Sequence, residues 1–385
     1  MQVGIALLTL FPGRVGGSET YVRGLLGEYA EGHGPERVAV LANRHVMAAY
    51  GDFARGPVSL HHVASYRPGD ANTTRLLAMA RAAALPRAAA RDVPPGLDAV
   101  HYPVTVPIPA TSSARIVALH DIQHHDLPGL FSRAERAYRR WAYDRSARTA
   151  DLVITGSEHA RARIVEGLGI PPERIEVVYH GIDHRRFAPD GRADEEQLLE
   201  RYPLPSRFVV YPANLWAHKN HRRLVEALAA LPDRDLHLVL TGQDYGRVDE
   251  LRRRADELSV GTRLHHLGHV SMEILASLYR RAQAMVFPSL YEGFGAPPLE
   301  AMACGCPVAS SDATSLPEVC GDAALLFEAR SVESIAEAIA RVSADVELRQ
   351  RLRGRGLARA RSFTWRASAE RHRAIYARVA ATRGH

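Results

Sequence analysis

The sequence predicts an α/β protein with two doubly wound, Rossmann-like domains. Short β-rich apolar runs alternate with helical patterns along most of its 385 residues. Such alternation requires mainly parallel sheets with helices on both faces. The chain is also too long for one typical core and fits two domains of roughly 100 to 200 residues each. Two such domains facing a central cleft would bind ligands between the carboxyl ends of their strands.

The first predicted domain covers residues 1–187. Its strands are expected at Val3–Leu7, Val38–Ala42, Ala99–Tyr102, Ile116–Leu119, Leu152–Thr155 and Ile175–Tyr179. Its helices are expected at Glu19–Tyr29, Thr74–Ala89, Ala134–Thr149 and His159–Leu168. Each helix separates two strands, as the crossover connections of a parallel sheet require.

A polar segment separates the two halves. Residues 188–206 contain Pro and Gly and have no apolar period until Leu198, which predicts a linker. The second domain, residues 207–361, repeats the alternation. Its strands are expected at Phe208–Pro212, Leu236–Thr241, Leu264–Leu267, Ala284–Phe287, Pro307–Ser310 and Ala323–Phe327. Residues 362–385 predict a last helix, with Trp365, Ile375 and Val379 on its buried side.

The composition narrows the class of partner. With 46% hydrophobic and 24% charged residues the chain is an ordinary globular protein, and its formal charge of +6 suits several anionic ligands equally. The arginines are spread over the predicted helices, and neither a zinc-finger spacing nor an aromatic RNA-binding signature occurs. A nucleic-acid partner is therefore not expected.

Cysteine usage and the apolar segments predict a cytoplasmic protein. Cys304, Cys306 and Cys320 form no second pair for a zinc site and are expected to be buried thiols in a reducing compartment. Residues 1–10 lack the basic region of a signal peptide and lead directly into a glycine loop. Nor does any apolar run reach the roughly 18 residues of a membrane span.

One lysine stands out among the basic residues. All the other 48 of the 49 Lys and Arg residues are arginines, whereas Lys219 lies at a predicted strand-to-helix junction. Lysine is a compact point charge and arginine a planar fork, so the two are not equivalent at a phosphate crowded against a helix N-terminus. Taken alone, Lys219 could also be an ordinary exposed cation.

Two carboxylates, Glu292 and Glu300, flank a glycine-rich loop further along the chain. Pro298 suits the first turn of a helix, which would place the amides of residues 294–299 at the positive end of that helix. Glu300, in the same turn, could complement the helix dipole, but Glu292 has no such explanation. Carboxylates that accept bonds from vicinal hydroxyls, beside a cradle for phosphate, are typical of a nucleotide-sugar site.

Further polar motifs follow strands of the first half. The loop containing Gly16 and Gly17 would let a ligand approach the backbone, although it lacks the G-x-G-x-x-G spacing of dinucleotide-binding proteins and could be a plain loop capped by Ser18. His120 and His180 each follow a predicted strand at the edge where ligands bind. His120 could contact a sugar hydroxyl or be structural, and His180 is interpreted as a turn former.

These motifs together resemble the retaining family-four glycosyltransferases of the two-Rossmann-domain (GT-B) type. The resemblance runs from Gly13 to about Phe327. It is carried by the Gly16-Gly17 loop, His120-Asp121, the Ser157 region, His180-Gly-Ile-Asp183, the Lys219 turn, Glu292-Gly-Phe-Gly295, Glu300 and Leu316-Pro-Glu318-Val. It implies the GT-B architecture, with the C-terminal helix crossing back to the N-terminal domain.

The resemblance also implies residue roles. Lys219 would neutralise the donor diphosphate and Glu300 would hold the ribose hydroxyls. Glu292 would bind hydroxyls of the donor sugar, and His120 would contact the transferred sugar. Further donor contacts are implied for Gly16, Gly17, Asn214, the amides of Gly293, Phe294 and Gly295, and the backbone of His269 and Val270, which would meet the base.

One position departs from the family pattern. The family usually places an Arg five residues before the Lys as a second diphosphate clamp, and here that position is Asn214. Weaker clamping, or compensation by Arg222, is expected in place of a loss of activity.

The predicted activity is transfer of a hexose from a nucleoside-diphosphate sugar to a hydroxyl acceptor in polysaccharide or natural-product biosynthesis, with retention and without a metal or other cofactor. A GDP-linked hexose such as mannose is favoured. The acceptor is a glycan, a lipid-linked molecule or a small molecule. A nucleotide-sugar 2-epimerase, a phosphorylase and a non-catalytic sugar-nucleotide binding protein are the alternatives.

A basic and aromatic stretch at residues 133–145 raises membrane contact as a further possibility. Glu135 and Asp144 interrupt its cationic face, so docking to a membrane is not favoured from the sequence.

Overall fold

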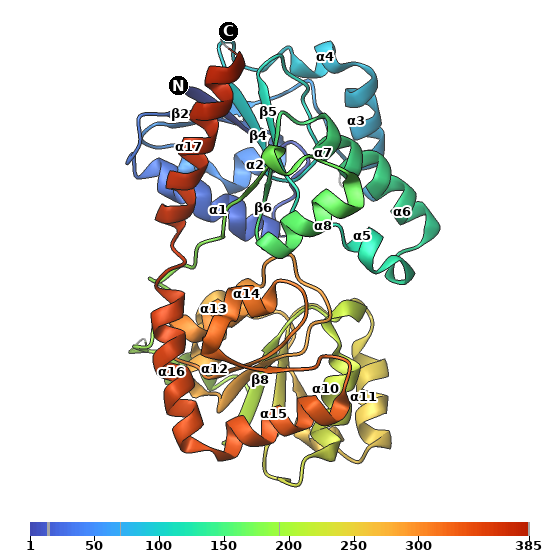
Figure 1. Ribbon diagram of the computed structural model, residues 1–385, viewed down its shortest axis with the longest axis vertical. Helices are drawn as coiled ribbons and strands as arrows, with labels where there is room; N and C mark the ends of the chain where they lie inside the picture. The colour runs from blue at the N-terminus through green and yellow to red at the C-terminus, as the bar shows by residue number, and fades with distance from the viewer. Residues whose placement is uncertain (14–15, 70, 192, 384–385) are drawn as a thin grey trace. The chain divides into compact units, whose positions relative to one another are not determined.

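The computed structural model describes residues 1–13, 16–69, 71–191 and 193–383. The chain divides into two compact units: Met1–Gly181 with Trp365–His385, and Ile182–Thr364. Each unit contains a parallel sheet with helices on both faces (Figure 1). The predicted class, α/β with two Rossmann-like domains, is confirmed.

The first unit contains a seven-stranded parallel sheet in the order β3-β2-β1-β4-β5-β6-β7. Its strands are β1 Gln2–Ala6, β2 Arg37–Ala42, β3 Val58–His62, β4 Ala99–Tyr102, β5 Ala114–Ala118, β6 Leu152–Thr155 and β7 Ile175–Val177. Strand β3 was not expected from the sequence. It pairs with β2 at the sheet edge and is only partly buried, so it lacks the continuous apolar run that marks the inner strands.

The helices of the first unit are α1 Gly17–Ala30, α2 Arg44–Ala49, α3 Asn72–Ala84, α4 Pro86–Ala90, α5 Gln123–Asp126, α6 Arg133–Arg139, α7 Arg145–Thr149, α8 Glu158–Leu168 and α17 Trp365–Arg383. The helix predicted at 74–89 is interrupted at Leu85, because a residue before proline is disfavoured in the helical region. A π-helical turn, Arg140–Asp144, joins α6 to α7.

Helix α17 belongs to the first unit, although the whole second unit precedes it in the chain. Its Trp365, Ile375 and Val379 are buried in the core shared with α1, as the sequence predicted. Figure 1 shows α17 lying beside α1.

The second unit contains a six-stranded parallel sheet in the order β10-β9-β8-β11-β12-β13. Its strands are β8 Phe208–Pro212, β9 His237–Thr241, β10 Leu264–His266, β11 Ala284–Phe287, β12 Val308–Ser311 and β13 Ala324–Phe327. Its helices are α9 Glu195–Leu199, α10 His221–Ala230, α11 Val248–Glu257, α12 Met272–Arg281, α13 Ala296–Ala303, α14 Leu316–Cys320, α15 Val332–Ala344 and α16 Val346–Ala360. All six strands agree with the sequence prediction to within a few residues.

The segment predicted as a linker, residues 188–206, lies inside the second unit. Leu199 of α9 is buried in that unit's core, and Arg280 Nη2 lies 2.7 Å from Glu195 Oε2. The polar composition concealed this packing because a five-residue helix buries few side chains. The chain passes between the units at 181/182 and at 364/365 instead.

Two further predictions concern buried and apolar residues. Cys304, Cys306 and Cys320 are buried free thiols, as expected. Among the described residues, no helix is long and apolar enough to cross a membrane.

Candidate functional site

The unique lysine lies at the carboxyl edge of the second unit's sheet. Strand β8 leads through a 3-10 turn, Ala217–Lys219, into α10. Asn220 joins the two in a left-handed conformation (φ 63°), and its Nδ2 donates to the carbonyl oxygens of Pro288 (3.0 Å) and Ala329 (2.7 Å). These bonds tie the turn to the loops that follow β11 and β13, and so fix the backbone of Lys219.

Lys219 and Glu292 form an ion pair. The distance from Lys219 Nζ to Glu292 Oε1 is 2.5 Å, and the two side chains are 14% and 13% exposed. The backbone of Glu292 is held on both sides: its N–H donates to Thr314 Oγ1 (3.0 Å), and its carbonyl accepts from Ser315 Oγ (3.0 Å). Two residues singled out in separate motifs are thus brought into contact.

Helix α13 begins directly after this loop. Gly295 is its N-cap with φ 98°, and a Cβ there would lie 2.6 Å from Leu316 Cδ2, so glycine is required twice over. The amides of residues 294–299 were predicted to lie at the positive end of this helix, but Pro297 and Pro298 have no N–H to contribute. The N–H groups that precede the prolines belong to residues 293–296.

Glu300 does not lie in the first turn of α13, as the sequence suggested, but is its fifth residue and is buried. Burial raises the pKa of Glu300 to about 7, and the positive charge of Arg186 opposes this shift only in part. A carboxyl group with this pKa is partly protonated at neutral pH. Such a group can donate or accept a hydrogen bond, whereas a dipole-complementing carboxylate would stay ionised.

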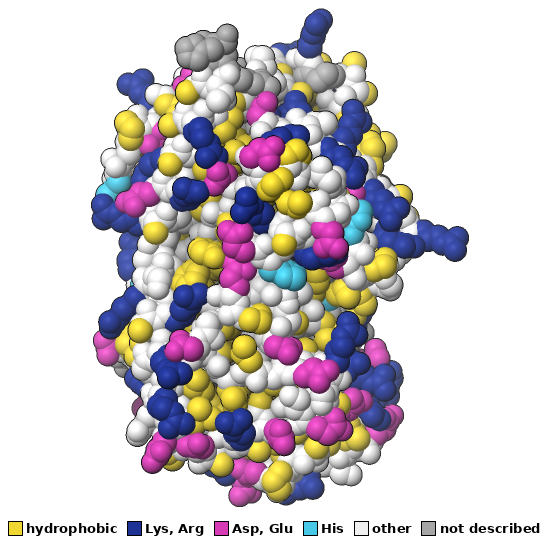
Figure 2. All heavy atoms as spheres, viewed as in Figure 1, with side chains coloured by type: hydrophobic (Ala, Val, Ile, Leu, Met, Phe, Trp, Pro, Cys, Tyr) yellow, Lys and Arg dark blue, Asp and Glu magenta, His cyan; other side chains and the backbone are white. Residues whose placement is uncertain are grey.

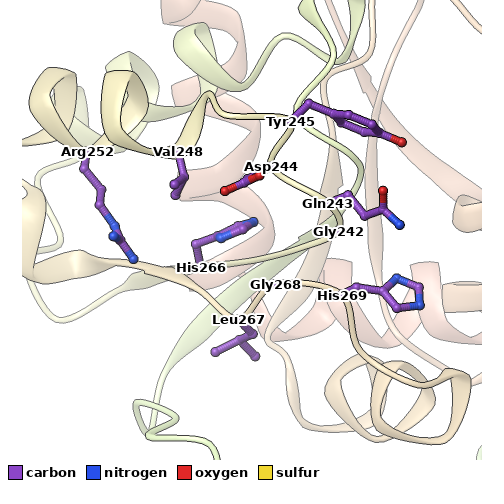
Figure 3. Close-up of a pocket in the computed structure, with 10 residues that line it drawn as sticks. All are labelled: Gly242, Gln243, Asp244, Tyr245, Val248, Arg252, His266, Leu267, Gly268 and His269. Atoms are coloured by element: carbon purple, nitrogen blue, oxygen red, sulfur yellow. The ribbon is translucent and has the colours of Figure 1, made fainter. Parts of the chain in front are cut away.

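A cavity of about 620 Å³ lies at the ends of β9 and β10. Figure 3 shows Arg252, His266 and Asp244 on one side of it and Gln243 and His269 on the other. The cavity is lined by Gly242, Gln243, Asp244, Tyr245, Val248, Arg252, His266, Leu267, Gly268 and His269. Of the two residues predicted to meet the base, His269 lines this cavity, whereas the Val270 side chain is buried in the core.

Asn214 braces the loop beside this cavity. Its Oδ1 accepts the N–H of Gln243 at 2.8 Å, and Gly242 packs so closely on Ala213 that a Cβ would lie 2.6 Å from the Ala213 carbonyl carbon. Arg222, the suggested substitute for a clamp at Asn214, is exposed and pairs with Glu226 at 3.2 Å. The Arg222 side chain therefore lies on the exposed surface of α10, where it pairs within its own helix.

In the first unit, the loop after β5 presents His120. Its Nε2 lies 3.2 Å from the Pro103 carbonyl oxygen, which can only accept, so Nε2 carries the hydrogen. Burial lowers the pKa of His120, which keeps the ring neutral. A neutral ring whose Nε2–H is already bonded to a carbonyl is better placed to contact a polar group than to transfer a proton.

His180 does more than form a turn. Its ring stacks on Tyr21, with 4.8 Å between the centroids, and lies edge-on to His120 at 5.5 Å. Tyr21 donates to His372 Nε2 (2.6 Å), so a buried group of aromatic and histidine rings surrounds His120. No sequence signal could have identified this group, because its members come from both ends of the chain.

The glycine loop of the first unit is described in part, since Arg14 and Val15 lie outside the described residues. Gly16 has φ 55° and takes the N-cap position of α1, which begins at Gly17, so the cap is not Ser18. A Cβ at Gly16 or Gly17 would meet no described atom within 4 Å. The Gly13 N–H, before the undescribed residues, donates to Glu19 Oε2 at 2.6 Å.

His124, His125 and Asp144 form a group of metal-binding residue types that the sequence analysis missed. The Asp144 carboxylate accepts bonds from His124 Nε2 (2.9 Å) and His125 Nε2 (2.8 Å). Burial would raise the pKa of Asp144, but these two bonds hold it below the usual value. The adjacent histidines were the available signal. Their shared partner, Asp144, lies 20 positions from His124, and nothing in the local sequence links it to the histidines.

Comparison with known proteins now places the chain. A family model described as Glycosyltransferase Family 4 matches residues 15–186, and one described as Glycosyl transferases group 1 matches residues 195–359. The O-antigen chain mannosyltransferase B of Escherichia coli is 32% identical over 275 residues, which are 70% of this chain and 71% of that protein. The chain belongs to the family-4 glycosyltransferases.

Other relatives of this family-4 glycosyltransferase match shorter parts. The D-inositol 3-phosphate glycosyltransferase of Corynebacterium glutamicum is 30% identical over 253 residues, 63% of this chain and 60% of that protein. The serotype-specific mannosyltransferase WbdA of Escherichia coli is 29% identical over 222 residues, 56% of this chain but only 27% of WbdA.

Solved structures agree on the fold of the glycosyltransferase. Sucrose-phosphate synthase from Thermosynechococcus elongatus superimposes with a TM-score of 0.76 at 22% identity, covering 99% of this chain and all of that one. HepE from Anabaena, solved with UDP and glucose, has a TM-score of 0.73 at 19% identity, with coverage of 98% and 99%. These likenesses show the GT-B fold.

Proposed function

We propose that this glycosyltransferase moves a hexose, with mannose favoured, from a nucleoside-diphosphate sugar to a hydroxyl of a glycan or natural-product acceptor, with retention at the anomeric carbon. The observation that carries the proposal is the pairing of Lys219 Nζ with Glu292 Oε1 at 2.5 Å, beside the N-terminus of α13. A cation for a diphosphate and a carboxylate for sugar hydroxyls lie next to each other there. Mannose is favoured because relatives are named as mannosyltransferases.

The main barrier to such a transfer is the negative charge that develops on the leaving diphosphate. A fixed cation and oriented backbone donors in a poorly hydrated site lower that barrier without reorganising. Lys219 supplies the cation, and the amides of residues 293–296 belong to the loop that leads into α13. On donor binding, a phosphate oxygen would replace Glu292 as the partner of Lys219. Glu292 would then accept hydrogen bonds from the sugar hydroxyls.

Retention is proposed to follow from attack on the face that the diphosphate leaves. A donor phosphate oxygen takes the acceptor proton, so no nucleophilic side chain and no metal ion is needed. Glu300 is buried and has a pKa of about 7, and it is assigned to the ribose hydroxyls. The contact of His120 with the transferred sugar remains a prediction.

The experiment is a donor screen followed by product analysis. Thermal-shift measurements with GDP-, UDP- and dTDP-hexoses identify the donor, with GDP-mannose expected to stabilise most. Release of nucleoside diphosphate is then measured with and without a glycan acceptor, and the anomeric configuration of the product is read by NMR. Release without any acceptor requirement, or an inverted product, contradicts the proposal.

A further inference from the structure

His124, His125 and Asp144 bring three potential metal ligands together in the first unit. Among the described residues, this is the only group of three His, Cys, Asp or Glu side chains whose ligand atoms all lie within 4.8 Å of one another. The histidines are neighbours on α5, and Asp144 ends the π-helical turn between α6 and α7. Two separate segments of the chain thus supply one set of ligands.

The separations between these atoms are close to those around a metal ion. Zn²⁺ binds histidine nitrogen and carboxylate oxygen at roughly 2.0 to 2.2 Å, so two ligands of a tetrahedral site lie about 3.3 Å apart. The Asp144 oxygens lie 2.9 Å from His124 Nε2 and 2.8 Å from His125 Nε2, and the centroids of the two imidazole rings are 4.5 Å apart. Small side-chain rotations would therefore admit an ion in place of the two ring hydrogens.

The charge of the group favours a cation. The Asp144 side chain is 3% exposed, and no arginine or lysine pairs with it in the part of the chain that the structure describes. The nearby Asp126 of α5, by contrast, is paired with Arg163. With both histidines neutral, the group carries one negative charge, and buried charges in proteins are usually paired or bound to a metal. A divalent cation would supply the missing positive charge.

The π-helical turn supports a special role for Asp144. In a regular α-helix, residues two apart do not share a side, yet Ala142 and Asp144 are both buried. A π turn closes its hydrogen bonds one residue later than an α turn and so rotates the side chains that follow. Such single turns are rare and occur frequently at functional sites.

Solvent reaches the group from one side. His124 is fully buried, whereas the His125 side chain is 22% exposed. Figure 2 shows histidine side chains at the surface on the side of the first unit where Figure 1 places α5. An ion can therefore enter beside His125, and a water molecule can take the fourth ligand position.

We propose that His124, His125 and Asp144 bind one Zn²⁺ ion, which holds α5 against the π-helical turn. Imidazole nitrogen suits Zn²⁺, whereas Mg²⁺ and Ca²⁺ prefer oxygen ligands alone. The ion has a structural role in the first unit, and Lys219 and Glu292, which are proposed to act on the donor, lie in the second. The inference does not rest on the proposed function.

His124 Nδ1 limits the affinity that we expect. Coordination through Nε2 leaves the ring hydrogen on Nδ1, which is buried and has no hydrogen-bond partner among the described residues. Loss of such an outer bond typically weakens metal binding by roughly 10- to 100-fold. The site should therefore release zinc to a strong chelator, so that metal-free protein can be prepared.

The test is a titration of the untagged, metal-free protein with Zn²⁺ and with Co²⁺, whose visible absorption reports its coordination. The variants are His125→Ala and Asp144→Asn, and the first disturbs folding least because His125 is the most exposed of the three ligands. The matched control is His265→Ala in the second unit. His265 Nε2 lies 2.9 Å from His237 Nδ1, in a histidine pair that has no third ligand among the described residues.

The wild type and the control are expected to bind one equivalent of Co²⁺ with the strong visible absorption of a four- or five-coordinate ion. Zn²⁺ should displace the Co²⁺ and raise the midpoint of thermal unfolding. Each test variant should bind at least about 100-fold more weakly, because it lacks one of three direct ligands. Unfolding curves without metal show that each variant folds.

Three results would overturn the proposal. Wild-type protein that binds neither ion shows that the group is a hydrogen-bonded clamp without a metal. Unchanged binding by either test variant places the ion elsewhere on the protein. An equally large loss of binding in His265→Ala shows that the effect is not specific to this group.

Discussion

At the scale of single residues, the ion pair of Lys219 and Glu292 dominates the candidate donor site. Both groups are largely removed from water, so each needs the other in the free protein. Removing one partner of such a pair leaves an uncompensated charge, and this costs more than the pair itself contributes. A diphosphate that replaces Glu292 as the partner of Lys219 would keep the lysine satisfied throughout the reaction.

Replacing the lysine should therefore lower turnover and also destabilise the fold, because Glu292 loses its partner. Lys219→Ala is expected to lower kcat/KM by an amount that corresponds to a loss of at least about 2 to 3 kcal/mol of transition-state stabilisation. Lys219→Arg should also be impaired, because a planar fork does not fit the space of a point charge between Glu292 and the Phe287 ring. Arg222→Ala, exposed on the next helix, is the control, and wild-type turnover of the arginine variant would refute the argument from the unique lysine.

The two glutamates should separate binding from turnover. Glu300→Ala is expected to weaken nucleoside-diphosphate binding, because Glu300 is assigned to the ribose. Glu292→Ala is expected to lower turnover while binding the nucleoside diphosphate at least as tightly as the wild type, since it frees Lys219 for phosphate. Calorimetry with the nucleoside diphosphate alone distinguishes them, and if Glu300→Ala binds as the wild type does, the ribose assignment fails.

At the scale of elements, helix α17 completes the first unit. Tyr21 on α1 donates to His372 Nε2 at 2.6 Å, and His101 Nδ1 lies 2.8 Å from the Tyr376 hydroxyl. Burial keeps the pKa values of His101 and His372 below that of free histidine, which leaves both rings neutral. Neutral rings of fixed orientation connect the C-terminal helix to the wall of the His120 loop.

The close approach of α1 and α17 depends on one glycine. A Cβ at Gly24 would overlap the indole ring of Trp365, whereas a Cβ at Gly27 on the same helix meets no described atom within 4 Å. Gly24→Ala should lower the free energy of unfolding by about 1 to 3 kcal/mol through overpacking. Gly27→Ala should raise it by roughly 0.5 to 1 kcal/mol through helix propensity. Thermal unfolding measures both changes, and equal effects would show that the helices adjust.

The buried histidines predict sensitivity to acid. Burial lowers the pKa of His372 to about 4, against 6.5 for the free side chain. The unfolded chain thus binds more protons below pH 6.5, and stability is lost as the pH falls from about 6.5 towards 4. By pH 5 this residue alone should cost roughly 2 kcal/mol relative to pH 7.5.

Urea unfolding at pH 7.5 and pH 5 measures this loss, and the variant His372→Gln is the comparison. Its amide can still bond to Tyr21 and does not titrate, so its stability should fall less with acid than that of the wild type. Identical losses in the two proteins would assign the acid sensitivity to other groups.

At the scale of the whole molecule, Lys219, Glu292 and Glu300 all lie in the second unit, whereas His120 lies in the first. The catalysis that we propose for the second unit relies on a lysine and backbone amides and does not require a metal ion.

Activity is therefore expected to survive removal of metal ions. Initial rates measured before and after dialysis against EDTA should agree, and added manganese should not raise them. The group of His124, His125 and Asp144 is the place where a bound ion would be sought, because both histidines contact the buried Asp144 carboxylate. Activity lost to EDTA and restored by manganese would contradict the proposed catalysis.

The sequence by itself determined the fold class and most of its elements. Inner strands such as β8 and β11 are continuous apolar runs. This local pattern can be recognised without knowing how the strands are arranged in the sheet. Lys219, Glu292 and Glu300 were identifiable because an unusual residue type or a glycine-rich setting marks each one locally. The edge strand β3 and the short helix α9 carry weaker patterns, and there the prediction missed or misassigned the segment.

Only the tertiary structure decided which of these residues meet. Lys219 contacts Glu292 across 73 positions, and Tyr21 contacts His372 across 351, because parallel strands gather distant loops at one sheet edge and α17 returns to α1. The contact between Asp144 and His124 likewise spans 20 positions. Local patterns specify backbone conformation, whereas contacts and burial depend on how remote segments pack, which spacing along the chain does not encode.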